Sequence, residues 1–453
     1  MKLTSLAGAI RAGSLGLTSL LLTAQASAQG YYVDEQSALR LGDAFSGGVA
    51  AASDASTVFY GPAAMTKVRD ELVFNLAAVS VNTEFDGDAT IAGIGAIDGQ
   101  KADADSLDLL PTFYMVRRLG DGFSMGAYIN APYATGNDFG DGSIARYSTT
   151  ESEITGIDAG FALAFQVHDR VSIGGSIIAQ YVNARTAVAV NTVGLCLQEA
   201  DAATCTSLGI DPALLGSDSL DGKFEMEGHN TAFGFSGGAL IDITAASRIG
   251  FNYRTRIAHE LSGTATAEFP DQSATFLSLA GLGTDIQADG KVRLVTPENA
   301  SLSYFHQLGK LSLQADYSWT RWSRYDQVRV ESDDPAVALL ASEPTRYNWT
   351  ESHRIAIGGS YQLSPVFTLR SGMAFDKTPI RNQDTKVDFA FADYKAISFG
   401  MSYLMAEDLT LDIGLQHTFT QKRDIDQTDQ GVNLNGEVTT EVNSFAAGLR
   451  WAM

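Results

Sequence analysis

From Glu71 to the end of the chain, apolar and polar residues alternate with a period of two in segment after segment. In segment 248–259, the odd positions from Ile249 to Ile257 suit an apolar surface, while the even positions carry Arg, Gly and Asn. The last segment repeats the pattern, with its apolar face formed by Phe445, Ala447, Leu449, Trp451 and Met453. Because the opposite faces carry Gly, Ser, Gln, Asp and Arg together, the pattern predicts strands between lipid and a polar interior.

The lengths of the connections distinguish a membrane barrel from a soluble sandwich, which also alternates. Short turns lie near residues 120–121, 168–169, 245–246, 308–309, 364–365 and 407–408. Long polar loops lie near residues 86–104, 136–150, 191–227, 270–287, 331–347, 378–390 and 423–438. Short turns at one end and long loops at the other are typical of outer-membrane barrels. We therefore predict an all-β fold over 71–453: a 14-stranded antiparallel transmembrane β-barrel with both ends at the periplasmic side.

Residues 29–70 differ from the rest of the chain because they lack sustained alternation and are rich in small residues, as in the stretch 41–55. A barrel of this size has a lumen wide enough to need a filler. The low charge of the segment argues against the alternative, a solvated periplasmic linker. We predict that residues 29–70 form a plug (hatch) inside the barrel.

Residues 1–28 carry the three parts of a secretory signal peptide in order. Lys2 and Arg11 form a basic start without acids, an apolar stretch follows at 15–24, and Ala26-Ser27-Ala28 forms a cleavage site. The alternative is an N-terminal helix of the mature fold. We predict cleavage after Ala28 and export of the mature chain.

Composition narrows the class of protein further. The 453 residues are 45% hydrophobic and 19% charged, a balance that argues against a disordered chain. No internal run of 18 apolar residues occurs, which excludes a bundle of membrane-spanning helices. The net charge of -22 repels phosphate backbones, so we expect no nucleic-acid partner.

The two cysteines, Cys196 and Cys205, lie in the long loop 191–227 with eight residues between them. In an exported protein an even number of cysteines favours a disulfide. The alternative is two free thiols that never meet.

Motifs for catalysis or metal binding are weak. The six histidines form no metal-binding spacing, and no cofactor-binding motif is complete. The run Gly234-Phe235-Ser236-Gly237-Gly238 matches a nucleophile motif, but it lies inside a predicted strand, where the required strand-to-helix turn is absent. We expect no metal, no cofactor and no enzymatic activity.

Several segments of the mature chain resemble the FadL family of outer-membrane long-chain fatty-acid transporters. The resemblance begins at the run from Ser37 to Gly47 and at Gly61-Pro62-Ala63. It continues through Asn130-Ala131-Pro132-Tyr133, residues 253–255, residues 353–358 and Phe375-Asp376. It implies a fourteen-stranded barrel closed by an N-terminal hatch, which agrees with the count of turns. It also implies a greasy groove in the loops 191–227 and 270–287, an inner pocket reached by the hatch, and a kinked third strand that opens the wall sideways.

The resemblance implies site residues. The hatch tip is Tyr31, and the lateral opening falls on Asn130, Pro132 and Tyr133 within 130–135. The family's basic residue that binds the ligand carboxylate aligns with Val188 in this chain. The nearest cation is Arg185, whose position in the alternation puts it on the lipid-facing side of the strand. A second family cation falls on Thr345, next to Arg346. The family's Asn-Pro-Ala hatch triplet is here Gly61-Pro62-Ala63, which loses the hydrogen bonds of the Asn side chain.

Together these features predict a channel in the outer membrane of a Gram-negative bacterium for passive uptake of hydrophobic molecules, long-chain fatty acids first. The altered cations give weight to neutral hydrocarbons, alkanes or aromatics, as an alternative cargo. A barrel enzyme acting on lipid and a surface receptor or adhesin are the rival classes. The expected partners are the hydrophobic ligand, outer-membrane lipid and lipopolysaccharide, and the expected state is a monomer.

Overall fold

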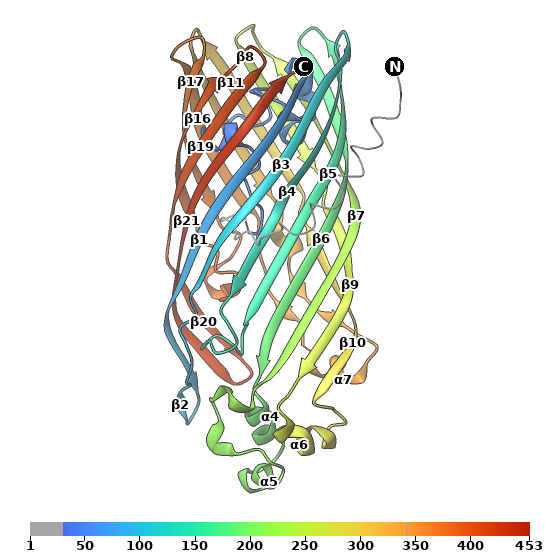
Figure 1. Ribbon diagram of the computed structural model, residues 1–453, viewed down its shortest axis with the longest axis vertical. Coiled ribbons are helices and arrows are strands. Elements are labelled where there is room, and N and C mark those ends of the chain that lie inside the picture. Colours follow the sequence, from blue (N-terminus) through green and yellow to red (C-terminus); the bar gives the residue numbers. More distant parts are fainter. Residues whose placement is uncertain (1–29, 342) are drawn as a thin grey trace.

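The computed structural model describes residues 30–341 and 343–453, and the predicted signal peptide, residues 1–28, lies outside the described residues. The described chain forms a long closed barrel with helices at one end (Figure 1). Its wall consists of β1 (Glu71–Ile91), β3 (Ala104–Gly120), β4 (Phe123–Asp138), β5 (Glu151–His168), β6 (Val171–Val190), β7 (Gly222–Asp242), β8 (Ser247–Arg254), β9 (Ile257–Glu268), β10 (Asp285–Thr296), β11 (Asn299–Leu308), β12 (Leu311–Thr320), β16 (Ser352–Gln362), β17 (Phe367–Lys377), β18 (Tyr394–Leu404), β19 (Leu409–Thr420), β20 (Arg423–Asp429) and β21 (Val432–Ala452).

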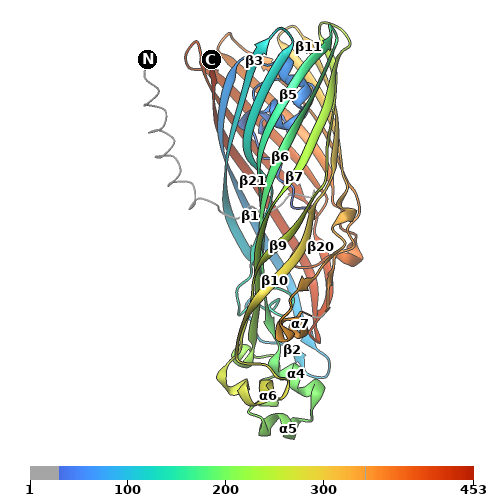
Figure 2. The same cartoon turned by 90° about the vertical axis from the view of Figure 1, so that its right-hand side faces the viewer.

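Three of the wall strands consist of two consecutive pieces, β8 with β9, β10 with β11, and β19 with β20. Counted as whole strands, fourteen antiparallel strands close the barrel when β1 pairs with β21 from Glu71–Ala452 to Ile91–Val432. The predicted 14-stranded barrel is confirmed. The short turns and the C-terminus lie at one end, and the helices of the long loops lie at the other (Figures 1 and 2).

The alternating residues take the two sides of the wall as their chemistry requires. Phe235, Phe399 and Trp451 are 56%, 60% and 54% exposed on the outside. Polar residues that alternate with outward-facing ones are buried inside, as Ser398 is beside Phe399 and Asn252 is beside Phe251. Among the described residues, no helix is both long and apolar enough to cross a membrane.

The alternation changes sides within all three of the two-piece strands. In β8, Ile249 and Phe251 point outward, but in β9 the same odd parity places Ile257 (1% exposed) and His259 inside. The prediction that Ile257 faces lipid is therefore wrong. Residues 255–256, between the two pieces, shift the pairing register with β7 by one residue, and a one-residue shift moves every following side chain to the other face.

Shorter elements lie in the long loops: β2 (Gly95–Ala96), α4 (Thr192–Glu199), α5 (Ala202–Ser207), α6 (Ala274–Leu279), β13 (Gln327–Val328), β14 (Val330–Glu331), α7 (Pro335–Leu340) and β15 (Thr345–Arg346). The last loop is shorter than predicted, because residues 423–438 belong mainly to β20 and β21, which pair from Arg423–Val438 to Asp429–Val432. The loop predicted at 191–227 ends where β7 begins at Gly222.

Residues 30–70, here the hatch segment, contain α2 (Ala38–Leu41), α3 (Thr57–Tyr60) and the 3-10 helix η1 (Pro62–Lys67). In both views the blue hatch segment is surrounded by the wall strands (Figures 1 and 2). Its backbone meets inward-facing side chains: Val49 N donates to Ser303 Oγ at 3.1 Å, and Arg248 Nη2 donates to Ala51 O at 2.8 Å.

Candidate functional site

The barrel wall is interrupted between its second and third strands. Among the described residues, the pairing of β3 with β4 ends at Phe113–Ile129, so the remainder of β4 pairs with β5 alone. On the β5 side, Ala131 and Pro132 fall out of the register between the pairs Asn130–Asp158 and Tyr133–Gly156. Pro132 has no N–H to give to a ladder, which explains why the interruption lies there. The structure thus places the predicted residues Asn130, Pro132 and Tyr133 at this break.

The start of the hatch segment takes the place of the missing strand. Val33 N donates to Pro132 O, and Ala134 N donates to Tyr31 O, both at 2.9 Å. The fully buried Gln36 completes the set: its Nε2 donates to Ala131 O at 2.8 Å and its Oε1 accepts from Ala131 N at 3.1 Å. Backbone groups freed by the break are therefore bonded to the hatch segment, as a nonpolar surrounding demands.

Tyr31 is fully buried in a set of aromatic rings inside the barrel. Its ring centroid lies 4.6 Å from that of Trp322, 5.5 Å from that of Tyr325 and 5.9 Å from that of Tyr133. The whole set, here the aromatic cluster, comprises Tyr31, Tyr133, Trp322, Tyr325, Tyr347, Trp349, Phe389 and Phe391. Edge-to-face contacts of this kind hold rings in fixed orientations. The cluster joins the hatch tip, the break in β4 and two long loops.

A cavity of about 1170 Å³ lies beside the aromatic cluster and reaches the long loops. Tyr325, Tyr347 and Phe389 of the cluster line it. Apolar side chains from the wall and from α4, α6 and α7 make up much of the remaining lining, including Val188, Leu195, Phe224, Leu261, Phe276, Leu277, Leu294 and Leu340. Its volume exceeds the roughly 300–1,000 Å³ usual for small-molecule sites, so it suits a long apolar ligand.

Three cations among the described residues line this cavity, and they differ in how they are paired. Arg185 is held by Glu225 at 2.9 Å and by Glu151 at 3.5 Å. Arg346 is exposed, and no described carboxylate lies within ion-pair distance of it. Lys386, half-buried in the loop before β18, is the third cation, and no feature of the sequence pointed to it. The predicted residues Val188, Arg185 and Arg346 thus share one cavity, whereas Tyr31 lies behind its aromatic wall.

Asp388 adds a buried carboxyl group to the same cavity. The Tyr347 hydroxyl donates to Asp388 Oδ2 at 2.6 Å. Removal from water raises the pKa of Asp388, an effect that the bond from Tyr347 and the charge of Lys386 oppose. The described residues include no group of three His, Cys, Asp or Glu side chains placed to hold a metal ion.

The long loops over the cavity are cross-linked. Cys196 in α4 and Cys205 in α5 are joined by a disulfide, with a Cα–Cα distance of 6.0 Å. Arg146, fully buried, pairs with Asp221 at 2.8 Å and donates to Gly216 O at 2.8 Å. The third nitrogen of the guanidinium, Nη1, donates to Asp98 O at 2.7 Å. One guanidinium therefore ties three loops together, which fixes the roof of the cavity.

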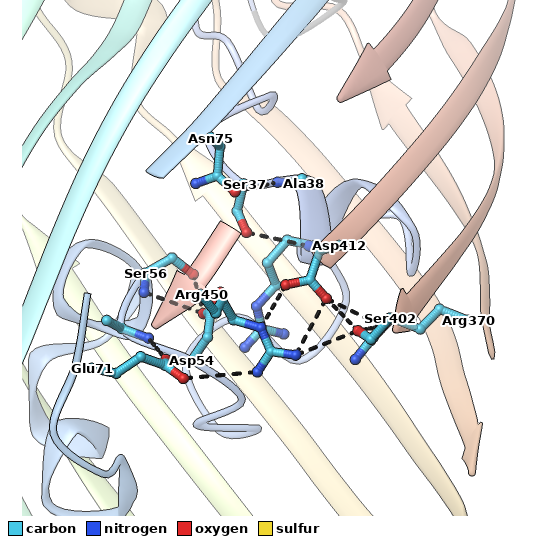
Figure 3. A network of polar contacts seen from close by, with 12 residues as sticks. Ser37, Ala38, Asp54, Ser56, Glu71, Asn75, Arg370, Ser402, Asp412 and Arg450 are labelled. Atoms are coloured by element: carbon cyan, nitrogen blue, oxygen red, sulfur yellow. Dashed lines mark hydrogen bonds and ion pairs between the residues drawn. The ribbon is translucent and has the colours of Figure 1, made fainter. Parts of the chain in front are cut away.

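Farther along the hatch segment, polar contacts attach it to the wall (Figure 3). Ala55 N donates to Glu71 Oε2 at 2.9 Å, and Ala38 N donates to Asn75 Oδ1 at 3.2 Å. Glu71 lies 3.9 Å from Arg450, which also pairs with Asp412. These wall charges compensate one another while leaving acceptors for the hatch backbone.

The predicted hatch triplet Gly61-Pro62-Ala63 lies at the start of η1. A Cβ at Gly61 would lie 2.7 Å from Val49 Cγ1, so close approach to Val49 requires glycine there. A Cβ at Gly174 of β6 would lie 2.6 Å from Ala63 N, so the wall also has a glycine at the contact. The substitution of glycine for the family's asparagine therefore accompanies tight packing of the triplet.

Comparisons with known proteins show which family this chain belongs to. A profile described as outer membrane protein transport protein (OMPP1/FadL/TodX) matches residues 19–452. The chain belongs to this family. A putative outer membrane protein of Neisseria meningitidis is 28% identical over 424 residues, with 90% of each chain covered. A long-chain fatty acid transport protein of Escherichia coli is 25% identical over 418 residues, covering 90% of this chain and 91% of the relative.

Solved structures show the same fold. A FadL homologue of Pseudomonas aeruginosa matches with a TM-score of 0.82 at 21% identity, covering 93% of this chain and 99% of the other. The toluene transporter TodX of Pseudomonas putida matches with a TM-score of 0.66 at 15% identity, covering 94% and 100%. Membership of the OMPP1/FadL/TodX family confirms the predicted resemblance and the location in the outer membrane of a Gram-negative bacterium.

Proposed function

We propose that this protein takes up long-chain fatty acids by passive diffusion through the cavity. The observation that carries the proposal is the position of the cavity, which lies between the apolar helices of the long loops and the aromatic cluster around the hatch tip. That cluster is bonded directly to the break in the wall. Membership of a family of outer-membrane transport proteins supports the same function, and the E. coli relative is named for fatty acids.

The acyl chain binds to the apolar lining. Each buried CH₂ contributes about 0.8 kcal/mol, so a chain of sixteen carbons is held strongly enough that its release needs a conformational step. We propose that residues 29–70 act as a plug and that the ligand displaces the hatch tip at Tyr31. This displacement removes the bonds to Pro132 and Ala134 and opens the break between β3 and β4 toward the bilayer.

The carboxylate binds to Arg346 and Lys386 in this scheme. Arg185 contributes less, because Glu225 and Glu151 already neutralise it. The protein needs no catalytic step, and we propose that it acts as a monomer embedded in outer-membrane lipid and lipopolysaccharide.

Neutral hydrocarbons are the second candidate cargo, and one observation favours them. Within the described part of the chain, five carboxylates and three cations line the cavity, and the carboxylates are Glu153, Glu199, Glu343, Asp388 and Asp429. Such a balance repels a free carboxylate and is indifferent to an alkane or an aromatic ring. TodX, a structural neighbour, is named as a toluene transporter.

Uptake by cells separates the two cargoes. In a strain without other proteins of this family, we expect the mature protein to restore uptake of labelled palmitic acid, and Arg346→Ala with Lys386→Ala to slow it about tenfold or more while hexadecane uptake is unchanged. Lys422→Ala is the matched control, since Lys422 is 64% exposed and pairs with Glu437 away from the cavity. Restored hexadecane uptake without palmitic acid uptake identifies hydrocarbons as the cargo, and no uptake of either contradicts the proposed function.

A further inference from the structure

Asp388, which lines the cavity, has a buried acceptor that the contacts described so far leave without a donor. Asp388 is 9% exposed, and its Oδ2 accepts from the Tyr347 hydroxyl. No described residue donates a hydrogen bond to its other oxygen, Oδ1. Buried carboxylate oxygens are normally bonded, because leaving one without a donor after removal from water is costly. The position therefore calls for a donor that the described chain does not supply.

A second acceptor without a donor lies next to the first. Asn137, near the end of the kinked β4, donates from Nδ2 to the Asp388 backbone oxygen at 2.7 Å. Its Oδ1 is buried and receives no hydrogen bond from any described residue. The bond from Nδ2 fixes the orientation of the amide, since the opposite orientation would turn one oxygen toward another. Two residues joined by a hydrogen bond thus each carry an acceptor without a donor.

The charges around Asp388 select the kind of donor. Lys386 lies two residues away in the same loop and lines the same cavity. Its positive charge acts on the Asp388 carboxyl group and repels a ligand with a cationic end. A neutral O–H group supplies one hydrogen without adding charge, and it fits an otherwise apolar ligand.

We propose that Asp388 Oδ1 accepts a hydrogen bond from an O–H group at the polar end of the ligand, so that the cavity selects hydrophobic molecules ending in an alcohol or an undissociated carboxylic acid. This inference rests on the proposed function, because it specifies the head group that the transport cavity recognises. An ether or ester of the same length fills the apolar part equally well but leaves Oδ1 without a donor. A site built to bond a hydroxyl discriminates strongly against such analogues.

Competition between two ligands tests the inference. The mature protein in detergent is incubated with equal amounts of hexadecanol and hexadecyl methyl ether, separated from free ligand, and the bound molecules are quantified by mass spectrometry. We expect the wild-type protein to retain the alcohol over the ether by about tenfold or more, the effect of one hydrogen bond to a charged group.

Asp388→Asn provides the decisive variant. Its amide oxygen can still accept from Tyr347, but an NH₂ group replaces Oδ1, so an acceptor becomes a donor that suits the ether oxygen. We expect the ratio of bound alcohol to bound ether to fall about tenfold. Glu343→Gln also removes one negative charge, at an exposed position of the same cavity. It should leave the ratio of bound alcohol to bound ether as in wild type. Tyr347→Phe, which keeps Oδ1, should not lower the ratio, and it guards against a general loss of packing.

The outcomes separate this inference from the proposed function. Equal retention of alcohol and ether by the wild type, with hexadecane and palmitic acid still bound, overturns the inference alone. An unchanged ratio in Asp388→Asn overturns it as well. Failure to bind any of the four molecules contradicts the proposed function. Binding of palmitic acid at pH 5 but not at pH 8, with hexadecanol bound at both, identifies the undissociated acid as one source of the O–H group. Equal binding of palmitic acid at both pH values shows that the ionised carboxylate binds to Arg346 and Lys386, as the proposed function has it, and alcohols are then the source of the O–H group at Asp388.

Discussion

Gln36 is the side chain whose loss should loosen the hatch tip most directly. In Gln36→Leu, a residue of similar size removes the bonds that the fully buried Gln36 makes to both backbone groups of the half-buried Ala131. Each buried group left unpaired costs about 1–3 kcal/mol, so the docked state loses about 2–6 kcal/mol. At about 1.4 kcal/mol per tenfold, undocking becomes roughly 30-fold to 10⁴-fold more frequent.

Hydrogen exchange of the β4 amides measures this opening, because exchange of a protected amide reports the frequency of local opening. We expect peptides covering residues 128–138 to exchange faster by that factor in Gln36→Leu, while peptides of β16 and β17 remain as in wild type. Thr66→Val is the matched control, since it removes one hatch-to-wall bond, to Ser172 Oγ, far from the break. Wild-type exchange at Ala131–Ala134 in Gln36→Leu would show that the backbone bonds of Tyr31 and Val33 hold the tip without the amide.

Three further predictions concern the loops, the plug and the exit. Alkylation of non-reduced protein should leave Cys196 and Cys205 unmodified in mass spectrometry, and modification of both would contradict the disulfide. Deletion of residues 31–60 should give an assembled barrel that conducts ions in planar bilayers, whereas the intact protein stays nearly closed. Equal conductance of the two proteins would contradict the proposal that the segment plugs the lumen. Replacing Pro132 and Ala134 by Val should favour continuous pairing and slow fatty-acid uptake several-fold at normal surface abundance, and unchanged uptake would argue for exit at the periplasmic end.

The wall could be predicted from the sequence because each of its strands obeys a local rule. Lipid and lumen impose opposite polarities on neighbouring residues. The alternation from Phe445 to Met453 therefore predicts this strand from its own sequence. The same rule failed at Ile257, because a register shift is set by pairing with β7, which the alternation of a single strand does not encode.

The site was less accessible to sequence reasoning, because its residues come from distant loops. Pro132 indicated the break because it lacks an N–H. Gln36, which bonds the backbone groups freed at the break, lies 95 residues before Ala131, and no pattern in the sequence distinguishes it. Lys386 and Asp388 lie in a loop with no periodicity, and their relation to Arg346 and Tyr347 appears only when the loops fold over the barrel. The signal that could have drawn attention to them is the density of aromatic residues at 389–394 and 347–349.

The placement of the hatch contacts also has a consequence for the order in which the molecule is built. Among the described residues, the hatch segment is synthesised first, yet α2 packs against β18, β19 and β21, which are synthesised last. Gly372 of β17 lies so close to Asp43 that any Cβ there would collide with the hatch backbone. We therefore expect docking of α2 to be coupled to the pairing of β1 with β21, when the nearly complete sheet curls around the hatch segment. A hatch that docks poorly should delay closure of the barrel during biogenesis, before any ligand is met.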